Sequence, residues 1–242
     1  MARLSIIIPA FNEEAELPVT LQHLNDVRAN LPLKSEIIVV DNNSSDETAK
    51  VALAHGAQVV FESVNQISKA RNAGARSASG DCFIFVDADS RPPLETVQEA
   101  VSELGAGAIG GGSVLAFEGE VGWLARWMTW SWNRLACSVG LAAGCFVWVR
   151  ADAFNQVGGF CEKRYAGEEL ILSRELKRLG RQSEQVFKIL SRYPVLTSAR
   201  KLAWYGAFTT AALHLLLAVF PFLLRSQAIC RFWYRRPSEG RD

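Results

Sequence analysis

The sequence predicts an α/β protein built on one sheet of mostly parallel strands, with helices on both faces. Three observations lead to this fold class. Short apolar runs alternate with amphipathic segments of helical length through the N-terminal half, their connections are short, and polar side chains collect where the apolar runs end. Strand–helix alternation with short connections produces parallel neighbours. Uninterrupted apolar strands are typical of a sheet that is covered on both faces.

Strands are expected at 4–9, 36–40, 58–61 and 82–86, where β-branched and other apolar residues follow one another. Helices are expected from 13 to about 30, from 47 to about 55 and from 68 to 79, and the first carries leucines along one face. Asn12 is a candidate cap for the first helix. Gly56 and Gly80 follow the other two helices and are expected to end them.

The acidic residues Asp87 and Asp89 follow the apolar run 82–86 directly. Open α/β sheets bind ligands at the carboxyl ends of their strands. Two carboxylates this close repel each other and are costly to desolvate, which favours a bound cation. Mg²⁺ or Mn²⁺, held by one or two carboxylates and completed by phosphate oxygens, suits such a site. The alternative is that Asp89 and Ser90 only cap a helix opened by Pro92-Pro93.

Polar clusters also follow the first two strands, at 12–13 and 41–43. Because the carboxyl ends of parallel strands meet at one edge, the three clusters together predict a ligand site there. The first strand is followed neither by a Gly-x-Gly-x-x-Gly sequence nor by a P-loop lysine, which disfavours a dinucleotide fold.

The composition excludes several other classes. The chain has 242 residues, a net charge of +1 and a hydrophobic content of 49%, so nothing indicates a nucleic-acid partner. Its five cysteines show no zinc spacing and suit a reducing compartment. The first apolar run is too short for a secretory signal, so a cytosolic location is expected for most of the chain.

Several blocks of the sequence resemble a known family. They include Ala70-Arg71-Asn72-Ala73-Gly74 and Phe85-Val86-Asp87-Ala88-Asp89, and others lie at 6–14, 38–48, 154–160, 167–170 and 176–180. In this order they resemble a family 2 glycosyltransferase with the GT-A fold, over roughly 4–181. The resemblance implies a Rossmann-type mixed, mostly parallel sheet, a nucleotide-sugar donor and inversion at the anomeric carbon.

The resemblance also implies a donor site for a UDP- or GDP-sugar and a site for Mn²⁺ or Mg²⁺. Asp89 is the implied ligand of the metal, with Asp87 as a second candidate. The implied donor contacts are Pro9, Phe11 and Glu13 at the nucleobase and ribose, Asp41 on the base, Arg71 on the base or the phosphates, and Asp87 on the ribose or the sugar.

Glu168 and Glu169 stand where the family usually has Glu-Asp, whose aspartate is the general base. By that alignment Glu169 takes the proton of the acceptor hydroxyl, with Glu168 as a rival, since carboxylates do this work in many enzymes. The same two residues are also an ordinary acidic first turn of an amphipathic helix. No Gln-x-x-Arg-Trp sequence of processive polysaccharide synthases is found, which argues against a polymerase.

Trp123, Trp127 and Trp130 share one face of a predicted helix, at spacings of four and three residues. The resemblance places them between the metal site and the base, where the acceptor enters. A tryptophan face there would stack on a sugar or rest at a membrane interface. Ordinary core packing is the alternative.

Residues 202–224 are nearly all apolar and predict a helix long enough to span a bilayer. A single span from the cytosol would place the basic tail, with Arg235 and Arg236, outside, against the positive-inside rule. In-plane or re-entrant attachment to the inner leaflet is therefore favoured, with a soluble core or oligomer helix as the alternative. The expected organisation is a GT-A-like domain at 1–198, with a nucleotide-binding half (1–104) and an acceptor and base half (105–198), then a membrane-associated segment at 199–242.

Together these features predict a metal-dependent inverting glycosyltransferase at the cytoplasmic face of the membrane, peripheral or C-terminally anchored. A lipid-linked or membrane-embedded acceptor is a hypothesis drawn from that location. One alternative is a non-catalytic membrane scaffold, which the Glu168-Glu169 departure favours. Another is a sugar nucleotidyltransferase, which would need a basic, glycine-rich loop after the first strand.

Overall fold

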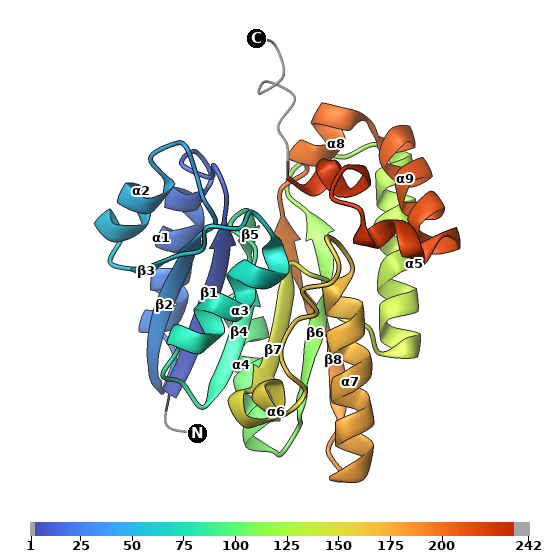
Figure 1. Cartoon of the computed structure of the whole chain (residues 1–242). Helices are drawn as coiled ribbons and strands as arrows, with labels where there is room; N and C mark the ends of the chain where they lie inside the picture. Colours follow the sequence, from blue (N-terminus) through green and yellow to red (C-terminus); the bar gives the residue numbers. More distant parts are fainter. Residues whose placement is uncertain (1–2, 235–242) are drawn as a thin grey trace.

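The computed structural model describes residues 3–234, and they form one mixed sheet with helices on both faces (Figure 1). The strand order is β3-β2-β1-β4-β7-β6-β8-β5. The strands are β1 (Arg3–Ala10), β2 (Lys34–Asp41), β3 (Gln58–Phe61), β4 (Cys82–Val86), β5 (Ser90–Arg91), β6 (Gly110–Phe117), β7 (Phe146–Arg150) and β8 (Phe187–Thr197). The α/β class predicted from the sequence is confirmed.

The strand directions differ between the two halves of the sheet. β3, β2, β1 and β4 are all parallel, as the alternation of strands and helices predicts. Beyond β4 the sheet becomes mixed, because β7 is antiparallel to both β4 and β6 and β5 is antiparallel to β8. β6 and β8 are again parallel neighbours.

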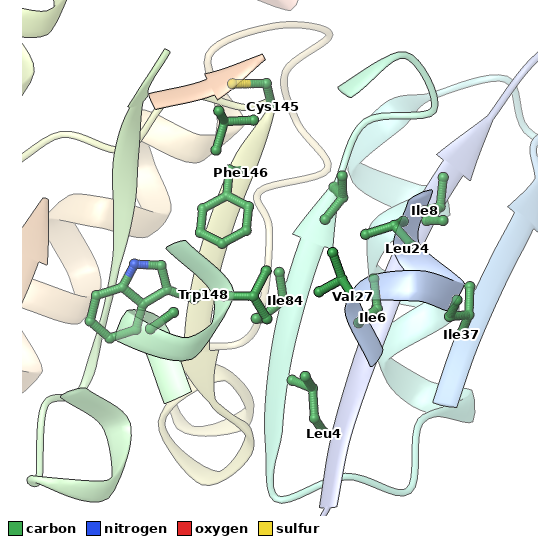
Figure 2. Packing of buried hydrophobic residues seen from close by; sticks show 14 of the residues in the cluster. Leu4, Ile6, Ile8, Leu24, Val27, Ile37, Ile84, Cys145, Phe146 and Trp148 are labelled. Atoms are coloured by element: carbon green, nitrogen blue, oxygen red, sulfur yellow. The ribbon is translucent and has the colours of Figure 1, made fainter. Parts of the chain in front are cut away.

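Seven helices precede the C-terminal segment of the described chain. They are α1 (Leu17–Ala29), α2 (Thr48–Ala54), α3 (Ile67–Ser77), α4 (Leu94–Gly105), α5 (Trp123–Val139), α6 (Ala151–Gln156) and α7 (Glu168–Gln182). Alternate residues of β1 enter two separate cores: Ile6 and Ile8 pack with α1, and Ile7 packs with α3 and α7. Figure 2 shows the first of these cores, which extends across the sheet to Trp148 on β7.

Helix α3 lies unusually close to the sheet, because Gly74 has no side chain. A Cβ at this position would stand 2.4 Å from Cγ2 of Ile7 on β1. Such a distance is far inside van der Waals contact, so only glycine allows this approach. The packing brings Arg71, one turn earlier on the same helix, against the carboxyl edge of the sheet.

The first helix begins later than the sequence predicts. α1 starts at Leu17 with Pro18 in its first turn, rather than at Glu13. Asn12 does not cap it: this residue has a φ of 52°, and its carboxamide oxygen accepts a hydrogen bond of 2.8 Å from the Ser45 amide. Asn12 therefore ties the loop after β1 to the loop after β2.

The single apolar helix predicted at 202–224 is wrong. The segment divides into α8 (Arg200–Tyr205), α9 (Ala207–Val219) and the 3₁₀ turns η1 (Pro221–Arg225) and η2 (Ile229–Trp233). Gly206, with a φ of 77°, separates α8 from α9, and Pro221 opens η1. Within residues 3–234 no helix has the length and apolarity needed to cross a bilayer. Arg235 and Arg236 of the predicted basic tail lie outside the described residues.

Candidate active site

The polar clusters predicted from the sequence meet at one edge of the sheet. Ala10 at the end of β1 lies beside Asp41 at the end of β2, and Ile7 of β1 lies beside Phe85 of β4. The register therefore brings the residues after β1, β2 and β4 together, as expected for parallel strands. Asp89 does not cap the following helix, because α4 begins only at Leu94, after Pro93.

Arg71 of α3 is the centre of the first charged cluster, and only 2% of it is exposed. Its Nη1 donates to Oε1 of Glu168, and its Nη2 donates to Oδ1 of Asp87 and to the carbonyl of Gly144, each at 2.8 Å. Burial opposes the charged form, but the carboxylates of Asp87 and Glu168 dominate and raise the pKa of Arg71. Arg71 thus joins the acidic triplet after β4 to the start of α7.

Asn72, the next residue of α3, joins the sequence block at 70–74 to the block at 154–160 by hydrogen bonds. Its Nδ2 donates to the carbonyl of Phe160 and its Oδ1 accepts from the Phe160 amide, both at 2.9 Å. The ring of Phe160 in turn lies under the Arg71 guanidinium, 5.1 Å from its carbon. The turn at 158–160 therefore holds Arg71 from one side while the carboxylates hold it from the other.

The two glutamates that begin α7 have different surroundings. Glu168 is buried and accepts from Arg71, so burial raises its pKa while Arg71 opposes that rise. Glu169 is partly exposed, and within residues 3–234 no salt bridge joins its carboxylate to another side chain. Burial, followed by the charge of Glu168, raises the pKa of Glu169 to about 8. A carboxyl group that titrates near neutral pH suits general acid–base work.

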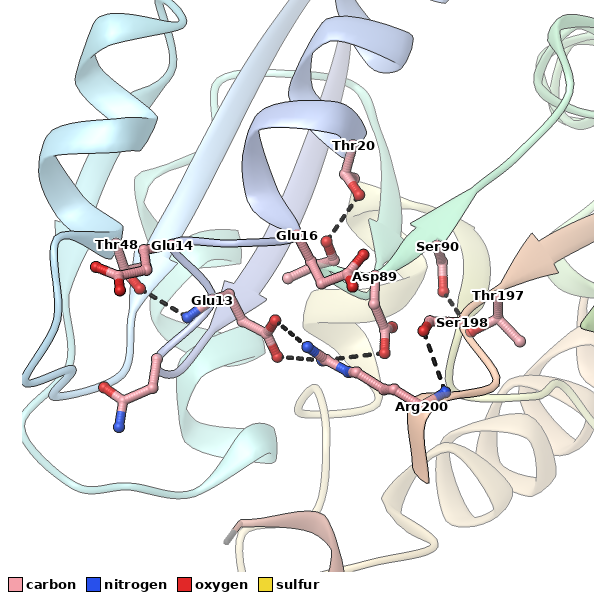
Figure 3. A network of polar contacts seen from close by, with 12 residues as sticks. Glu13, Glu14, Glu16, Thr20, Thr48, Asp89, Ser90, Thr197, Ser198 and Arg200 are labelled. Carbon is pink, nitrogen blue, oxygen red and sulfur yellow. Dashed lines mark hydrogen bonds and ion pairs between the residues drawn. The ribbon is translucent and has the colours of Figure 1, made fainter. Parts of the chain in front are cut away.

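Arg200 is the centre of a second charged cluster, which the sequence alone did not indicate (Figure 3). Its Nη1 donates to Oε2 of Glu13 at 2.6 Å, its Nη2 pairs with the other oxygen of Glu13, and Nη2 lies 3.0 Å from Oδ2 of Asp89. Arg200 is not among the candidate site residues that the sequence predicts. Its partner Asp89 lies 111 residues earlier in the 242-residue chain, so no local sequence pattern indicates the pair.

The remaining predicted donor residues lie at the same edge. Asp41 is buried, and its Oδ1 accepts a hydrogen bond of 2.9 Å from the Ser44 amide. The backbone amide of Glu13 donates to the Thr48 hydroxyl at 2.8 Å. Pro9 and Phe11 are half-buried at the end of β1. The expected donor contacts stay predictions for all six residues, which are Pro9, Phe11, Glu13, Asp41, Arg71 and Asp87.

The carboxylates fit a divalent cation that binds together with a diphosphate. Among residues 3–234, no three His, Cys, Asp or Glu side chains are grouped to hold a metal by themselves. Asp89, however, is a nearly buried carboxylate whose partner, Arg200, is itself a cation at 3.0 Å. One carboxylate completed by phosphate oxygens is a usual ligand set for Mg²⁺. Asp87 is held by Arg71 instead, so its role as a second ligand stays a prediction.

The tryptophans of α5 are on the surface of the described chain. Trp123 is 73% exposed, and Trp127 and Trp130 are each 59% exposed. The alternative of ordinary core packing is therefore wrong for these three residues. Their predicted place in an acceptor region is not tested by these exposures.

Comparison with known proteins identifies the class of enzyme to which this fold and this cluster of polar residues belong. The family model for glycosyl transferase family 2 matches residues 5–158. The chain therefore belongs to glycosyl transferase family 2, which confirms the predicted resemblance and enzyme class. The match covers β1 to α6 and ends before the two glutamates of α7.

Curated relatives share the N-terminal part of the chain. An uncharacterized glycosyltransferase of Mycobacterium tuberculosis is 38% identical over 104 residues, which are 43% of this chain and 44% of the relative. The undecaprenyl-phosphate 4-deoxy-4-formamido-L-arabinose transferase of Klebsiella pneumoniae is 32% identical over 117 residues, covering 43% of this chain and 34% of the relative. Each match thus spans less than half of the relative.

Solved structures resemble the chain over a longer range. The glucosyl-3-phosphoglycerate synthase of Mycobacterium tuberculosis, in complex with Mn²⁺, UDP and glucosyl-3-phosphoglycerate, has a TM-score of 0.61 and 24% identity, covering 90% of this chain and 79% of its own. The mannosyltransferase PcManGT of Pyrobaculum calidifontis, in complex with GDP-Man and Mn²⁺, has a TM-score of 0.64 and 18% identity, covering 86% and 64%. These likenesses support the GT-A-like fold.

Proposed function

We propose that the protein is an inverting glycosyltransferase that moves a sugar from a UDP- or GDP-sugar to an acceptor hydroxyl with the help of Mn²⁺ or Mg²⁺. The observation that carries the proposal is the link made by Arg71. Its guanidinium joins Asp87, on the donor side of the sheet edge, to Glu168 at the start of α7. Glu169 is the next residue, so the link sets a carboxylate beside the predicted donor site.

Glu169 is the general base in this proposal, and Glu168 is a positioning residue. Glu168 is committed to Arg71 by a buried ion pair, and withdrawing it would leave an uncompensated buried charge. Glu169 has no such partner within residues 3–234 and has a pKa of about 8. These different surroundings support Glu169 rather than Glu168 as the base.

The reaction needs a base that takes the proton of the attacking hydroxyl. It also needs a positive charge that neutralises the leaving diphosphate. A single base that deprotonates the attacking hydroxyl suits one in-line displacement, which inverts the anomeric carbon. When bound, a divalent ion supplies the second requirement, because it acts as a Lewis acid toward the leaving diphosphate. Asp89 is the residue that would hold it.

The acceptor is proposed to be lipid-linked. Relatives bear names such as undecaprenyl-phosphate 4-deoxy-4-formamido-L-arabinose transferase and dolichyl-phosphate beta-glucosyltransferase, and the latter, from Mus musculus, is 31% identical over 118 residues. These names describe the relatives. For this chain they support a lipid-linked acceptor.

The test is donor hydrolysis and transfer with a panel of nucleotide sugars, with and without Mn²⁺. We expect one donor to be consumed only with the metal, and NMR of the product to show the inverted anomeric configuration. Asp89→Asn should abolish turnover, whereas Asp26→Asn, at an exposed position of α1, should not. A folded protein that neither binds nor consumes any donor would instead support the non-catalytic scaffold.

A further inference from the structure

The structure assigns a membrane-docking surface to α5, α9 and η1, and we propose that its partner is a bilayer containing anionic lipids. This surface is called the aromatic surface below. On α5 it consists of Trp123, Trp127 and Trp130. On α9 and η1 it consists of Phe208, Leu215, Leu216, Val219, Phe220 and Phe222, all of which are exposed.

The apolar residues of α9 face outward in a helical pattern. Phe208, Ala212, Leu215 and Val219 recur at spacings of four, three and four residues, and each is exposed. The opposite side is covered, because Thr210 and Leu217 are buried and Leu217 packs against Ala166 and Leu224. A helix that is apolar on every side normally lies in a core or in a membrane. Here the protein covers only one side of it.

The elements that carry the aromatic surface lie together in the fold. Helix α5 packs against α9, and α9 packs against η1. Figure 1 places them at one end of the molecule, away from β3. An exposed apolar surface shared by several elements and built from large side chains marks an interaction site. Tryptophan in particular is enriched where a protein meets the interface of a bilayer.

Charge argues for an anionic partner and against a second copy of the chain. No Asp or Glu occurs from Val121 to Ala151, or from Gln185 to Tyr234. Exposed Arg126 and Arg134 lie on α5, and exposed Arg225 and Arg231 follow α9. In a symmetric dimer the same surface faces itself, so these cations would meet cations without a counter-charge. Anionic headgroups supply that counter-charge, and acyl chains accept the aromatic side chains.

The aromatic surface is connected directly to the candidate active site. Helix α8 begins at Arg200, which contacts Glu13 and Asp89, and only Gly206 separates α8 from α9. Docking would therefore bring the site close to the headgroups, within reach of a lipid-linked hydroxyl. This consequence rests on the proposed function, but docking itself does not, since it needs neither donor nor metal.

The experiment is co-flotation of the full chain with vesicles, in the absence of substrate. We expect the protein to float with vesicles of equal parts phosphatidylcholine and phosphatidylglycerol, and less with phosphatidylcholine alone. Added salt should weaken the binding, because screening removes the contribution of the arginines. Lipids brominated near the headgroup should quench the tryptophan fluorescence.

Two variants test the aromatic surface separately. Trp123→Ser/Trp127→Ser/Trp130→Ser and Phe208→Ser/Leu215→Ser should each lower the vesicle partition coefficient by about tenfold or more. The control is Leu53→Ser/Phe61→Ser, at apolar positions that are 61% and 62% exposed but belong to α2 and β3. Circular dichroism and thermal melting establish that each variant is folded.

Three results would overturn the proposal. The wild type would stay unbound with anionic vesicles, or both surface variants would bind as well as the control. Alternatively, light scattering would show a wild-type dimer that the tryptophan variant converts to a monomer, which would make a second copy the occupant. A wild type that does not dock but still turns over a soluble acceptor would refute the membrane surface and leave the glycosyltransferase standing. A folded wild type that floats normally but neither binds nor consumes any donor would do the reverse.

Discussion

Asp87 and Asp89 are two residues apart, yet each carboxylate is paired with a different arginine and in a different way. Asp87 shares Arg71 with Glu168, in a cluster that is also closed by the carbonyl of Gly144 and the ring of Phe160. Asp89 shares Arg200 with Glu13, at the end of β8 where the C-terminal helices begin. The side chain of Arg71 is 3% exposed and that of Arg200 is 14% exposed.

The two clusters have different roles, although each is built from one arginine and two carboxylates. In the Arg71 cluster the guanidinium and Glu168 are buried, so removing either charge leaves the other unpaired in the interior. The Arg200 cluster lies on the predicted metal carboxylate, so a bound cation would take over the charge that Arg200 now supplies. The first cluster is a fixed support, and the second is a contact that binding would replace.

The largest effect is expected from Arg71→Met. Removing this guanidinium leaves Glu168 as a buried carboxylate without a partner and also removes the partner of the half-buried Asp87, at a cost of about 3–5 kcal/mol. For a chain of this size the melting temperature should fall by roughly 10 °C or more. Thermal melting followed by circular dichroism measures the change.

The matched control is Arg76→Met, at an exposed position of the same helix. It should shift the melting temperature by no more than about 2 °C, as for other surface changes. Equal shifts for the two variants would contradict the view of Arg71 as an enclosed support.

The next effect is on turnover. Glu169→Gln keeps the shape of the side chain but removes the proton acceptor, so kcat should fall by about 10²–10⁴-fold. The fold should be retained, because the buried Arg71 keeps its ion pairs with Asp87 and Glu168 in this variant. Steady-state kinetics with the preferred donor measure the loss.

Glu175→Gln, on an exposed part of α7, is the control and should keep most of the activity. If Glu168→Gln keeps its fold and is less active than Glu169→Gln by a margin that its stability does not explain, Glu168 is the base instead.

The pH dependence of stability should differ between wild type and Glu169→Gln. Folding raises the pKa of Glu169 from 4.5 to about 8, so the native state holds this proton more tightly than the unfolded chain does. The resulting stabilisation is fully present below pH 4.5 and is lost as the pH rises to about 8. The glutamine variant has no such titration.

The melting temperature of Glu169→Gln minus that of the wild type should therefore be near its minimum at pH 4.5 and grow until about pH 8. Scanning calorimetry over this range measures it. A difference that does not change with pH would show that Glu169 titrates at its ordinary value.

The smallest effect is expected at Arg200. Arg200→Met frees Asp89 for a cation, so the affinity for Mn²⁺ without nucleotide should rise by about three- to tenfold. Lys201→Met is the control, because no ion pair joins the neighbouring Lys201 to Asp89 among the described residues. Electron paramagnetic resonance of free Mn²⁺ gives both affinities, and an unchanged or weaker affinity in Arg200→Met would show that the guanidinium does not compete with the metal.

Much of the parallel half of the fold was predictable from local patterns. The strands at 58–61 and 82–86 were predicted with the bounds that the structure shows. Their apolar runs are continuous and end at polar residues, so the pattern and the hydrogen-bonded ladder stop together. The first helix was misplaced because the Asn12 side chain bonds to the loop after β2, and such a distant partner leaves no mark near position 12.

The other half of the sheet was not predicted. The strands β6 and β7 belong to 105–150, where the sequence analysis placed none. β6 opens with Gly110, Gly111 and Gly112, which have poor strand propensity. A Cβ at Gly111 would stand 2.4 Å from the ring of Trp148, so this glycine lets the ring pack against the backbone of β6. Tertiary packing overrides the local preference here.

Local patterns in the sequence predict the parallel half of the sheet, the family, and the residue types that gather at the carboxyl edge of the sheet. These follow from patterns within a few residues or from ordered motifs, so they need no knowledge of distant partners. Three features are visible only in the folded structure. Arg71 joins Asp87 to Glu168, Arg200 pairs with Asp89, and the apolar C-terminal segment breaks into short helices with an exposed face. Each of these depends on a pairing between residues far apart in the chain, and a charge or an apolar side chain carries no local sign of the partner that will neutralise or cover it.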